Sequence, residues 1–297
     1  NADNISSNNI TGKDAFSLAS NLSNMVFKNL DALHFNDKAH TFVDSFRGTQ
    51  GKHVTTYDAA YSIVALSIYQ RAQDALPVGY ASDDGADVSL KTQQGKRALA
   101  MMTAQANFII KQLTGKNGLV FDGLTINSKH DTGQSLDAQF AAIRGLSSAF
   151  LATQKPRFRE AARKLYLAVD KHYYDASLKT WAINGKGHYS PWTAAAVASA
   201  MRETMLHLRN NESENAPALE LSSLVERYAD WFKAVIDGPV LGQGLQLSEA
   251  LADTGEYLLN EKNHGADNDN DNVANITGAG GKYGRANVMA AKVVLSN

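Results

Sequence analysis

The chain has 297 residues, 44% of them hydrophobic and 20% charged, with a formal net charge of -1. This composition is typical of a globular protein and excludes a disordered or fibrous chain. A net charge this small supplies no long-range attraction for nucleic acid or for an anionic membrane. Cysteine is absent, which excludes disulfides, thiolate metal sites and a cysteine nucleophile. No apolar run approaches the roughly 18 to 20 residues of a membrane span, so we expect no transmembrane segment.

The beginning of the chain is polar and without periodicity. We expect residues 1–13 to be flexible and residues 14–297 to form a single domain. Two loops interrupt that domain in our prediction, an insertion at 77–95 and an Asp/Asn/Gly-rich loop at 261–284. The Asn-rich and Ser-rich start does not begin with Met, which suggests a removed leader and a periplasmic or extracellular protein. A cytoplasmic location is the alternative.

Apolar residues recur at helical spacing along the first third of the chain. Residues 14–33, 57–72 and 95–113 each carry apolar side chains three and four positions apart, which predicts a helix with one buried face. In the first of these helices the predicted buried residues are Phe16, Ala19, Leu22, Val26, Leu30 and Leu33. Strands are hardly indicated anywhere.

The middle of the chain predicts helices of two alternating kinds. Residues 135–153 are apolar on most sides, which predicts a buried helix that stops at Gln154. Pro156 then suits the first position of a helix with a single apolar stripe, since its missing N–H costs nothing there. The same order returns downstream, with a buried helix over 192–208 and an amphipathic helix that opens at Pro217.

The buried helices begin with a common pattern of a capping hydroxyl, an early polar residue and then small residues. It appears at Thr56-Tyr57-Asp58 and Ser135-Leu136-Asp137, and in outline at Ser190-Pro191-Trp192 and Leu247-Ser248-Glu249. The later starts follow one another at steps of about 55 residues, the length of a hairpin of two helices with its loops. The sequence therefore predicts a series of helical hairpins.

A series of hairpins with buried inner and amphipathic outer helices resembles the α/α-toroid superfamily of six-hairpin glycosidases, sugar epimerases and toroid polysaccharide lyases. The resemblance covers about residues 14–260 and is best carried by SLDAQFAAIRGLSSAFLATQKPRFREAARKLYLAVDKHYYDASLKTWAI. It implies an all-α fold, an α/α toroid of about five to six hairpins. It also implies a glycoside hydrolase or a polysaccharide lyase acting on an oligosaccharide or polysaccharide. The alternative is a noncatalytic toroid that binds a glycan or a protein partner.

In such toroids the site resembles a funnel at the end where the inner helices begin. Asp58, Asp137 and His188 are therefore the candidate catalytic residues, because paired carboxylates or a histidine can transfer protons. The candidate substrate-binding residues near them are Tyr57, His130, Tyr189 and Trp192. The competing interpretation is structural, since an Asp in a first turn is favoured by the helix dipole and by free N–H groups.

Alternating acids near the end of the chain suggest a calcium site. Asp267, Asp269 and Asp271 provide oxygen ligands at every second position. The EF-hand pattern fails because Asn272 replaces its turn glycine and Gly278 its bidentate glutamate. A solvated acidic loop is the alternative, and we expect no other cofactor.

Overall fold

The computed structural model describes residues 12–75, 88–128, 130–182, 191–209 and 219–237. Its helices are α2 (Gly12–Asn29), α3 (Thr56–Ala75), α4 (Val88–Phe108), α5 (Leu136–Thr153), α6 (Pro156–Tyr173), α7 (Pro191–Glu203) and α8 (Leu221–Asp237). Single π-helical turns η1 (Leu30–His34), η2 (Ile109–Leu113) and η3 (Thr204–Leu208) extend α2, α4 and α7. Within these ranges no helix has both the length and the apolar character needed to cross a membrane.

Short antiparallel strand pairs lie between the described helices. They are β1 (Phe35–Asn36) with β2 (Thr41–Phe42), β3 (Ser45–Phe46) with β4 (Thr49–Gln50), β5 (His53–Thr55) with β6 (Gly123–Thr125), and β7 (Tyr174–Asp175) with β8 (Thr180–Trp181). Of these pairs, β5 and β6 are the two strands that are far apart in the sequence. Their pairing joins the segment that enters α3 to the segment that leads into α5.

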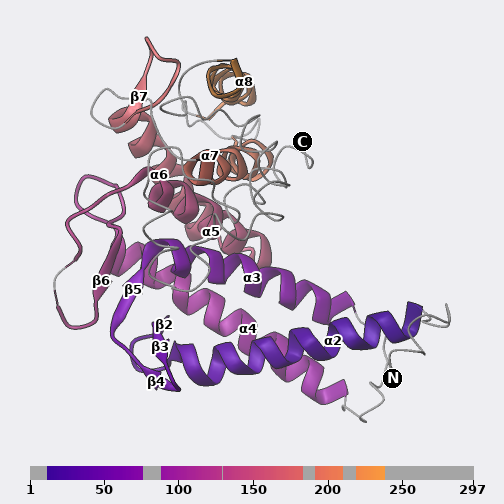
Figure 1. The fold of residues 1–297 in the computed structure, drawn as a ribbon. Coiled ribbons are helices and arrows are strands. Elements are labelled where there is room, and N and C mark those ends of the chain that lie inside the picture. The colour runs from indigo at the N-terminus through magenta and orange to yellow at the C-terminus, as the bar shows by residue number, and fades with distance from the viewer. Residues whose placement is uncertain (1–11, 76–87, 129, 183–190, 210–218, 238–297) are drawn as a thin grey trace, which may run out of the picture.

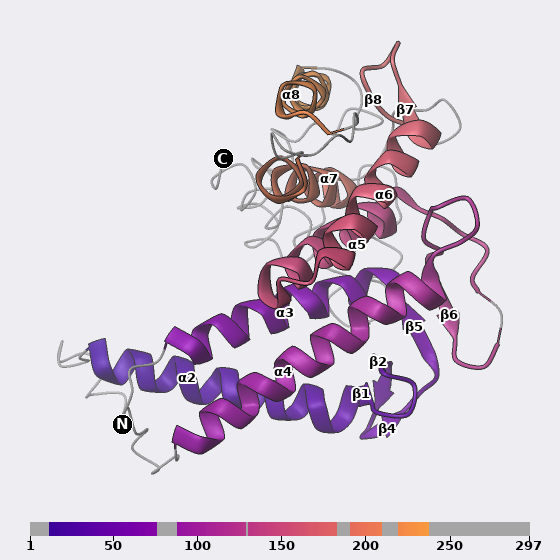
Figure 2. The same ribbon diagram turned by 180° about the vertical axis from the view of Figure 1, so that it is seen from behind.

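The helices form an inner and an outer layer. α3, α5 and α7 pack against one another in chain order, and each also packs against the outer helix that follows it, α4, α6 or α8. The hairpins α3–α4, α5–α6 and α7–α8 thus stand side by side, as Figure 1 and the reverse view in Figure 2 show. The prediction of an all-α, α/α-toroid fold is confirmed.

Helix α5 begins and ends where the sequence predicts. The Ser135 hydroxyl accepts a hydrogen bond from the Ala138 N–H at its start, which satisfies a donor that the first turn leaves free. Gln154 adopts a left-handed conformation, φ 54°, and ends the helix. Pro156 then stands in the first turn of α6.

Two inner helices come into backbone contact at Gly145 of α5. A Cβ atom at this position would lie 2.9 Å from both Cα and the carbonyl oxygen of Ala60 on α3. Only a glycine allows the two backbones to approach this closely. Beyond this contact Phe140 packs edge-on against Trp181, with ring centroids 5.1 Å apart, so α5 and the β7–β8 ribbon share one core.

The predicted buried face of the first helix is largely wrong. Leu22, Val26 and Leu33 are 49%, 53% and 37% exposed, whereas Phe27 is only 4% exposed. Phe27 stacks on Tyr69 of α3 at 4.5 Å between ring centroids, and the Tyr69 hydroxyl donates to Asn24. Periodicity detects an apolar stripe, but the neighbouring helix covers the side with the best combined aromatic and polar contacts.

Two segment boundaries also differ from the prediction. α4 begins at Val88, so residues 88–95 of the predicted loop insertion are helical, and Gly95 is buried inside the helix. A glycine costs an isolated helix about 1 kcal/mol, and the burial of the surrounding apolar residues offsets that cost. α2 begins at Gly12, inside the segment predicted to be flexible, and residues 77–87 and 261–284 lie outside the described ranges.

Candidate functional site

The first turns of α3 and α5 are held side by side by Asp122. Its backbone carbonyl accepts from the Thr56 N–H at 2.8 Å. Its Oδ1 accepts from both the N–H and the hydroxyl of Ser135, each at 2.7 Å. One residue therefore fixes the starts of two neighbouring inner helices, at the end where the resemblance to toroids implies a site.

Helix α5 is buried over most of its length except at two charged side chains. From Leu136 to Ala149 every residue is buried apart from Asp137 and Arg144. They stand seven positions apart, which is two helical turns and therefore the same face, with a rise of about 10.5 Å. An inner helix with no other charged residue thus carries one acid and one base on the same side.

The environment of Asp137 raises its pKa above the usual value of 3.8. The main cause is burial, which disfavours the charged carboxylate, and the nearby charge of Asp122 acts in the same direction. Hydrogen bonds from its own N–H and from Ser135 oppose the shift without cancelling it. A carboxyl group with a raised pKa is suited to holding and releasing a proton.

The adjacent surface of α3 carries two tyrosines, one of them in contact with Arg144. Tyr57 and Tyr61 are half-buried and stacked, with ring centroids 4.6 Å apart. The guanidinium carbon of Arg144 lies 5.3 Å from the centroid of Tyr61, and its Nη1 donates to the Tyr61 hydroxyl at 3.4 Å. α3 and α5 together therefore form a surface with aromatic, cationic and acidic side chains. We call these four residues, Tyr57, Tyr61, Asp137 and Arg144, the α3–α5 surface.

Asp58 takes part in the cap of its own helix. Its Oδ2 accepts from the Thr55 hydroxyl at 2.7 Å, while its N–H donates to the same hydroxyl oxygen at 3.1 Å. This reciprocal pair is similar to a capping box, with a hydroxyl in place of the backbone N–H as the donor to the acid. The structural interpretation of Asp58 is thus supported by its contacts, and its catalytic role stays a prediction.

Of the other predicted site residues, His130 and Trp192 lie within the described ranges. His130 stacks on Phe121 with centroids 4.4 Å apart, and its Nε2 contacts the carbonyl of Gln112 at the end of η2. Trp192 stands in the first turn of α7, with its side chain outside the described atoms. His188, Tyr189, Asp267, Asp269 and Asp271 lie outside the described residues. Within the described ranges no three acidic or histidine side chains are grouped to hold a metal ion.

A histidine–carboxylate pair beside the start of α3 was not predicted from the sequence. His53 on β5 lies 3.0 Å from Asp131 through Nε2 and Oδ2, and both side chains are about two-fifths exposed, at 41% and 39%. Gly123 makes room for them, because a Cβ there would lie 2.7 Å from the Asp131 carboxylate. Strand alternation puts His53 on the same face as Thr55, which caps α3 together with Asp58. The 78 positions between the partners leave no local signal of this pair.

Asp122 and Arg144 were also not predicted, for different reasons. The role of Asp122 depends on helix starts that are distant from it in the sequence. Arg144 did have a signal, since it is the single charged residue within the apolar part of α5 that follows Asp137. A charged residue in a helix that is predicted to be apolar on most sides is a sign of a functional position.

Comparison with known proteins establishes the fold. No protein-family model matches the chain, and no curated protein sequence matches it. The crystal structure of a D-mannose isomerase superposes with a TM-score of 0.50 at 15% identity, over 95% of this chain and 72% of the other. A cellobiose 2-epimerase from Bacillus thermoamylovorans B4167 gives a TM-score of 0.49 at 10% identity, over 93% and 72%. The chain has the α/α-toroid fold, and the resemblance seen in the sequence is confirmed at that level.

Replacing Asp122 by Ala is expected to lower the free energy of unfolding by about 2–3 kcal/mol, because two charge-assisted hydrogen bonds to Ser135 are lost. Urea denaturation followed by circular dichroism measures the loss. Asp37→Ala is the matched control, since the exposed Asp37 carboxylate shares Arg97 with Asp31 and its removal should cost less than about 0.5 kcal/mol. Equal losses in the two variants would contradict the role of Asp122.

Proposed function

We propose that this protein is a sugar isomerase or epimerase, which binds a sugar on the α3–α5 surface and transfers a proton of that sugar. The proposal rests on the two partly exposed charged residues of the buried helix α5. Asp137, an acid with a raised pKa, and Arg144 lie on the same face of that helix. A structural neighbour with the same fold is named a D-mannose isomerase, which supports sugar as the substrate class.

Each residue of the α3–α5 surface has a role in this proposal. The Asp137 carboxylate takes a proton from the carbon next to the sugar carbonyl and returns it to the former carbonyl carbon. The hydroxyl proton on the first of these carbons passes to the former carbonyl oxygen, so an aldose becomes a ketose with no co-reactant. The charge that develops on the enediol oxygens is stabilised by the Arg144 guanidinium. The Tyr57 and Tyr61 rings contact the apolar face of the sugar.

The resemblance seen in the sequence also implies two other reactions, glycoside hydrolysis and uronate elimination. Hydrolysis uses two carboxyl groups on either side of the scissile bond. Asp58 accepts from the capping residue Thr55, and Asp122 accepts from Ser135, so both acids near the helix starts are bound into structural contacts. Asp137 is the acid that belongs to the α3–α5 surface. The described contacts thus favour proton transfer by one carboxyl group. Glycan binding without catalysis is the remaining alternative.

The proposal is tested by the exchange of the sugar's carbon-bound hydrogen with deuterium from heavy water, which does not require the product to be known in advance. The protein is incubated in D2O with a panel of aldoses, ketoses and disaccharides, and proton NMR follows the signal beside the carbonyl carbon. Loss of that signal, with appearance of the isomer, is the expected result. Release of reducing ends or of unsaturated uronates from polysaccharides would instead support a hydrolase or a lyase. Saturable sugar binding with no chemistry would favour the noncatalytic toroid.

Arg144→Met is expected to weaken sugar binding about tenfold, because Met keeps much of the length of the side chain but removes its donors and charge. Isothermal titration with the best sugar of the panel measures the change. Arg157→Met is the matched control, since Arg157 is exposed on the first turn of the outer helix α6. Undiminished affinity in Arg144→Met would remove Arg144 from the site.

A further inference from the structure

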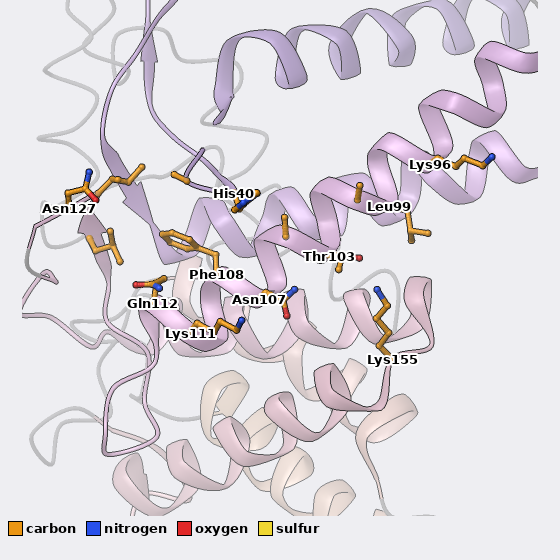
Figure 3. A pocket seen from close by; sticks show the side chains of 15 residues that line it. His40, Lys96, Leu99, Thr103, Asn107, Phe108, Lys111, Gln112, Asn127 and Lys155 are labelled. Atoms are coloured by element: carbon orange, nitrogen blue, oxygen red, sulfur yellow. The ribbon is translucent and has the colours of Figure 1, made fainter. Parts of the chain in front are cut away.

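A concave site separate from the α3–α5 surface lies along the outer helix α4. The cavity has a volume of about 780 Å³. Its floor is one face of α4 and of its extension η2, with lining residues at successive spacings of three and one from Lys96 to Gln112. Residues 39–40, part of the β6 segment and Lys155 complete its walls, as Figure 3 shows. The described residues that line it include no member of the α3–α5 surface.

The charged side chains that line this α4 groove are basic. Lys96 and Lys111 come from α4 and η2, Lys155 precedes α6, and His40 adds an imidazole. Among the described lining residues there is no carboxylate. In the described part of the chain none of the three lysine ammonium groups has an ion-pair partner, whereas Lys164 and Lys179 do. Unneutralised lysines around a concave surface produce a positive potential that attracts anions.

The surface between these lysines is mainly apolar. Leu99, Ala100, Ala104 and Phe108 follow one another along α4, and Leu124 and Ile126 approach from the β6 segment. Thr103 and Asn107 are neutral polar groups among them. In Figure 3 the Lys155 side chain points toward α4 near Thr103, and Lys111 lies beside Asn107. The groove thus offers apolar contact along its length and ammonium groups near both ends.

We propose that the α4 groove binds a small amphiphilic anion, in which a carboxylate, sulfonate or phosphate group is joined to an apolar body. The acid group pairs with the lysines, and the body lies along Leu99, Ala100 and Ala104. The volume falls within the range of about 300–1,000 Å³ of small-molecule sites. Among the described lining residues the buried Phe108 is the single aromatic carbocycle, which favours an aliphatic or aryl body over a sugar ring. This site is independent of the proposed sugar chemistry.

Two dyes that differ only in their acid group test the proposal. The anionic probe is 1-anilinonaphthalene-8-sulfonate, and N-phenyl-1-naphthylamine is the same ring system without the sulfonate. Fluorescence titration of the full chain is expected to show one saturable sulfonate site. Dodecanoate and dodecyl phosphate should displace the probe, whereas dodecanol and inorganic phosphate should not. Displacement by inorganic phosphate alone would reduce the site to a simple anion site and overturn the amphiphile proposal.

Variants separate the contributions of charge and shape. The triple variant Lys96→Gln, Lys111→Gln, Lys155→Gln should weaken the sulfonate dye about tenfold and change the neutral dye less than about twofold. Lys28→Gln, Lys164→Gln, Lys171→Gln removes the same charge from exposed positions elsewhere and should change neither dye. Ala100→Trp fills the groove without changing charge and should weaken both dyes. Sulfonate binding that survives both the lysine triple variant and Ala100→Trp would overturn the proposal.

Discussion

Asp137→Asn is expected to lower turnover of the sugar substrate by about 10²- to 10⁴-fold, the usual contribution of a positioned proton-transfer group. The same substitution is expected to stabilise the folded protein at pH 7. The reason is that the pKa of Asp137 is raised by burial, so ionisation of this carboxyl group costs more in the folded than in the unfolded chain. Lost activity with gained stability is typical of a functional rather than a structural side chain.

The pH dependence of that stability follows from the direction of the shift. Below the usual pKa of 3.8 the carboxyl group is protonated in both states and contributes no penalty. As the pH rises, the unfolded chain ionises first, and the stability of the wild-type protein falls until the pH passes the raised pKa. Urea denaturation between pH 3 and pH 7 should therefore show a gap between Asp137→Asn and wild type that opens with pH.

Two controls accompany this measurement. Asp58→Asn tests the catalytic prediction for the other first-turn acid, and unchanged turnover would leave Asp58 as a capping residue only. Asp230→Asn removes an acid from the outer helix α8, where it pairs with Lys179, and should alter neither turnover nor the pH profile. Full activity in Asp137→Asn would refute the assignment of Asp137 as the proton carrier.

The second large effect is expected at the contact between α3 and α5. Gly145→Ala should lower the free energy of unfolding by about 1–3 kcal/mol, and Gly145→Leu by more, because each added atom meets the backbone of Ala60. An alanine in place of a helical glycine would otherwise stabilise by about 1 kcal/mol, so steric overlap and helix propensity predict opposite signs. Thermal and urea unfolding decide between them.

The control for this effect is a similar increase in side-chain size at an exposed position of an inner helix. Ala65→Leu changes an exposed position of α3 and should alter stability by less than about 0.5 kcal/mol. If Gly145→Ala proves more stable than wild type, the Ala60 backbone does not lie as close as 2.9 Å to a Cβ atom at position 145. Sugar binding should fall with Gly145→Leu in any fraction that folds, since Tyr61 and Arg144 come from the two helices that it separates.

The helices were predictable because their signals are local. The Ser135 cap, the left-handed Gln154 and Pro156 at the first turn of α6 act within a few residues, and their positions agree with the structure. Buried and amphipathic helices could be distinguished by composition, and this distinction is enough to predict the inner and outer layers of a toroid. The buried side of α2 could not be predicted, because it depends on Tyr69 and other side chains from distant helices.

The candidate site divides in the same way. Tyr57 and Asp137 were found because the first turns of inner helices can be located in the sequence. The contact of Arg144 with Tyr61, the bonds of Asp122 to Thr56 and Ser135, and the His53–Asp131 pair all join residues that are far apart or on different elements. Helix periodicity carries no information about which partner such a side chain meets.

The resemblance to α/α toroids implied the end of the inner helices at which a site is expected. The sequence by itself determined the helices and their alternation of buried and amphipathic faces. These properties arise from capping and from burial of apolar stripes, which act over one or two helical turns. Only the tertiary structure decided that Asp58 takes part in the cap of α3, and that Asp137 and Arg144 are the partly exposed charged residues of a buried helix. The physical reason is that desolvation and hydrogen-bond partners, which separate a cap from a candidate proton carrier, are set by packing between helices.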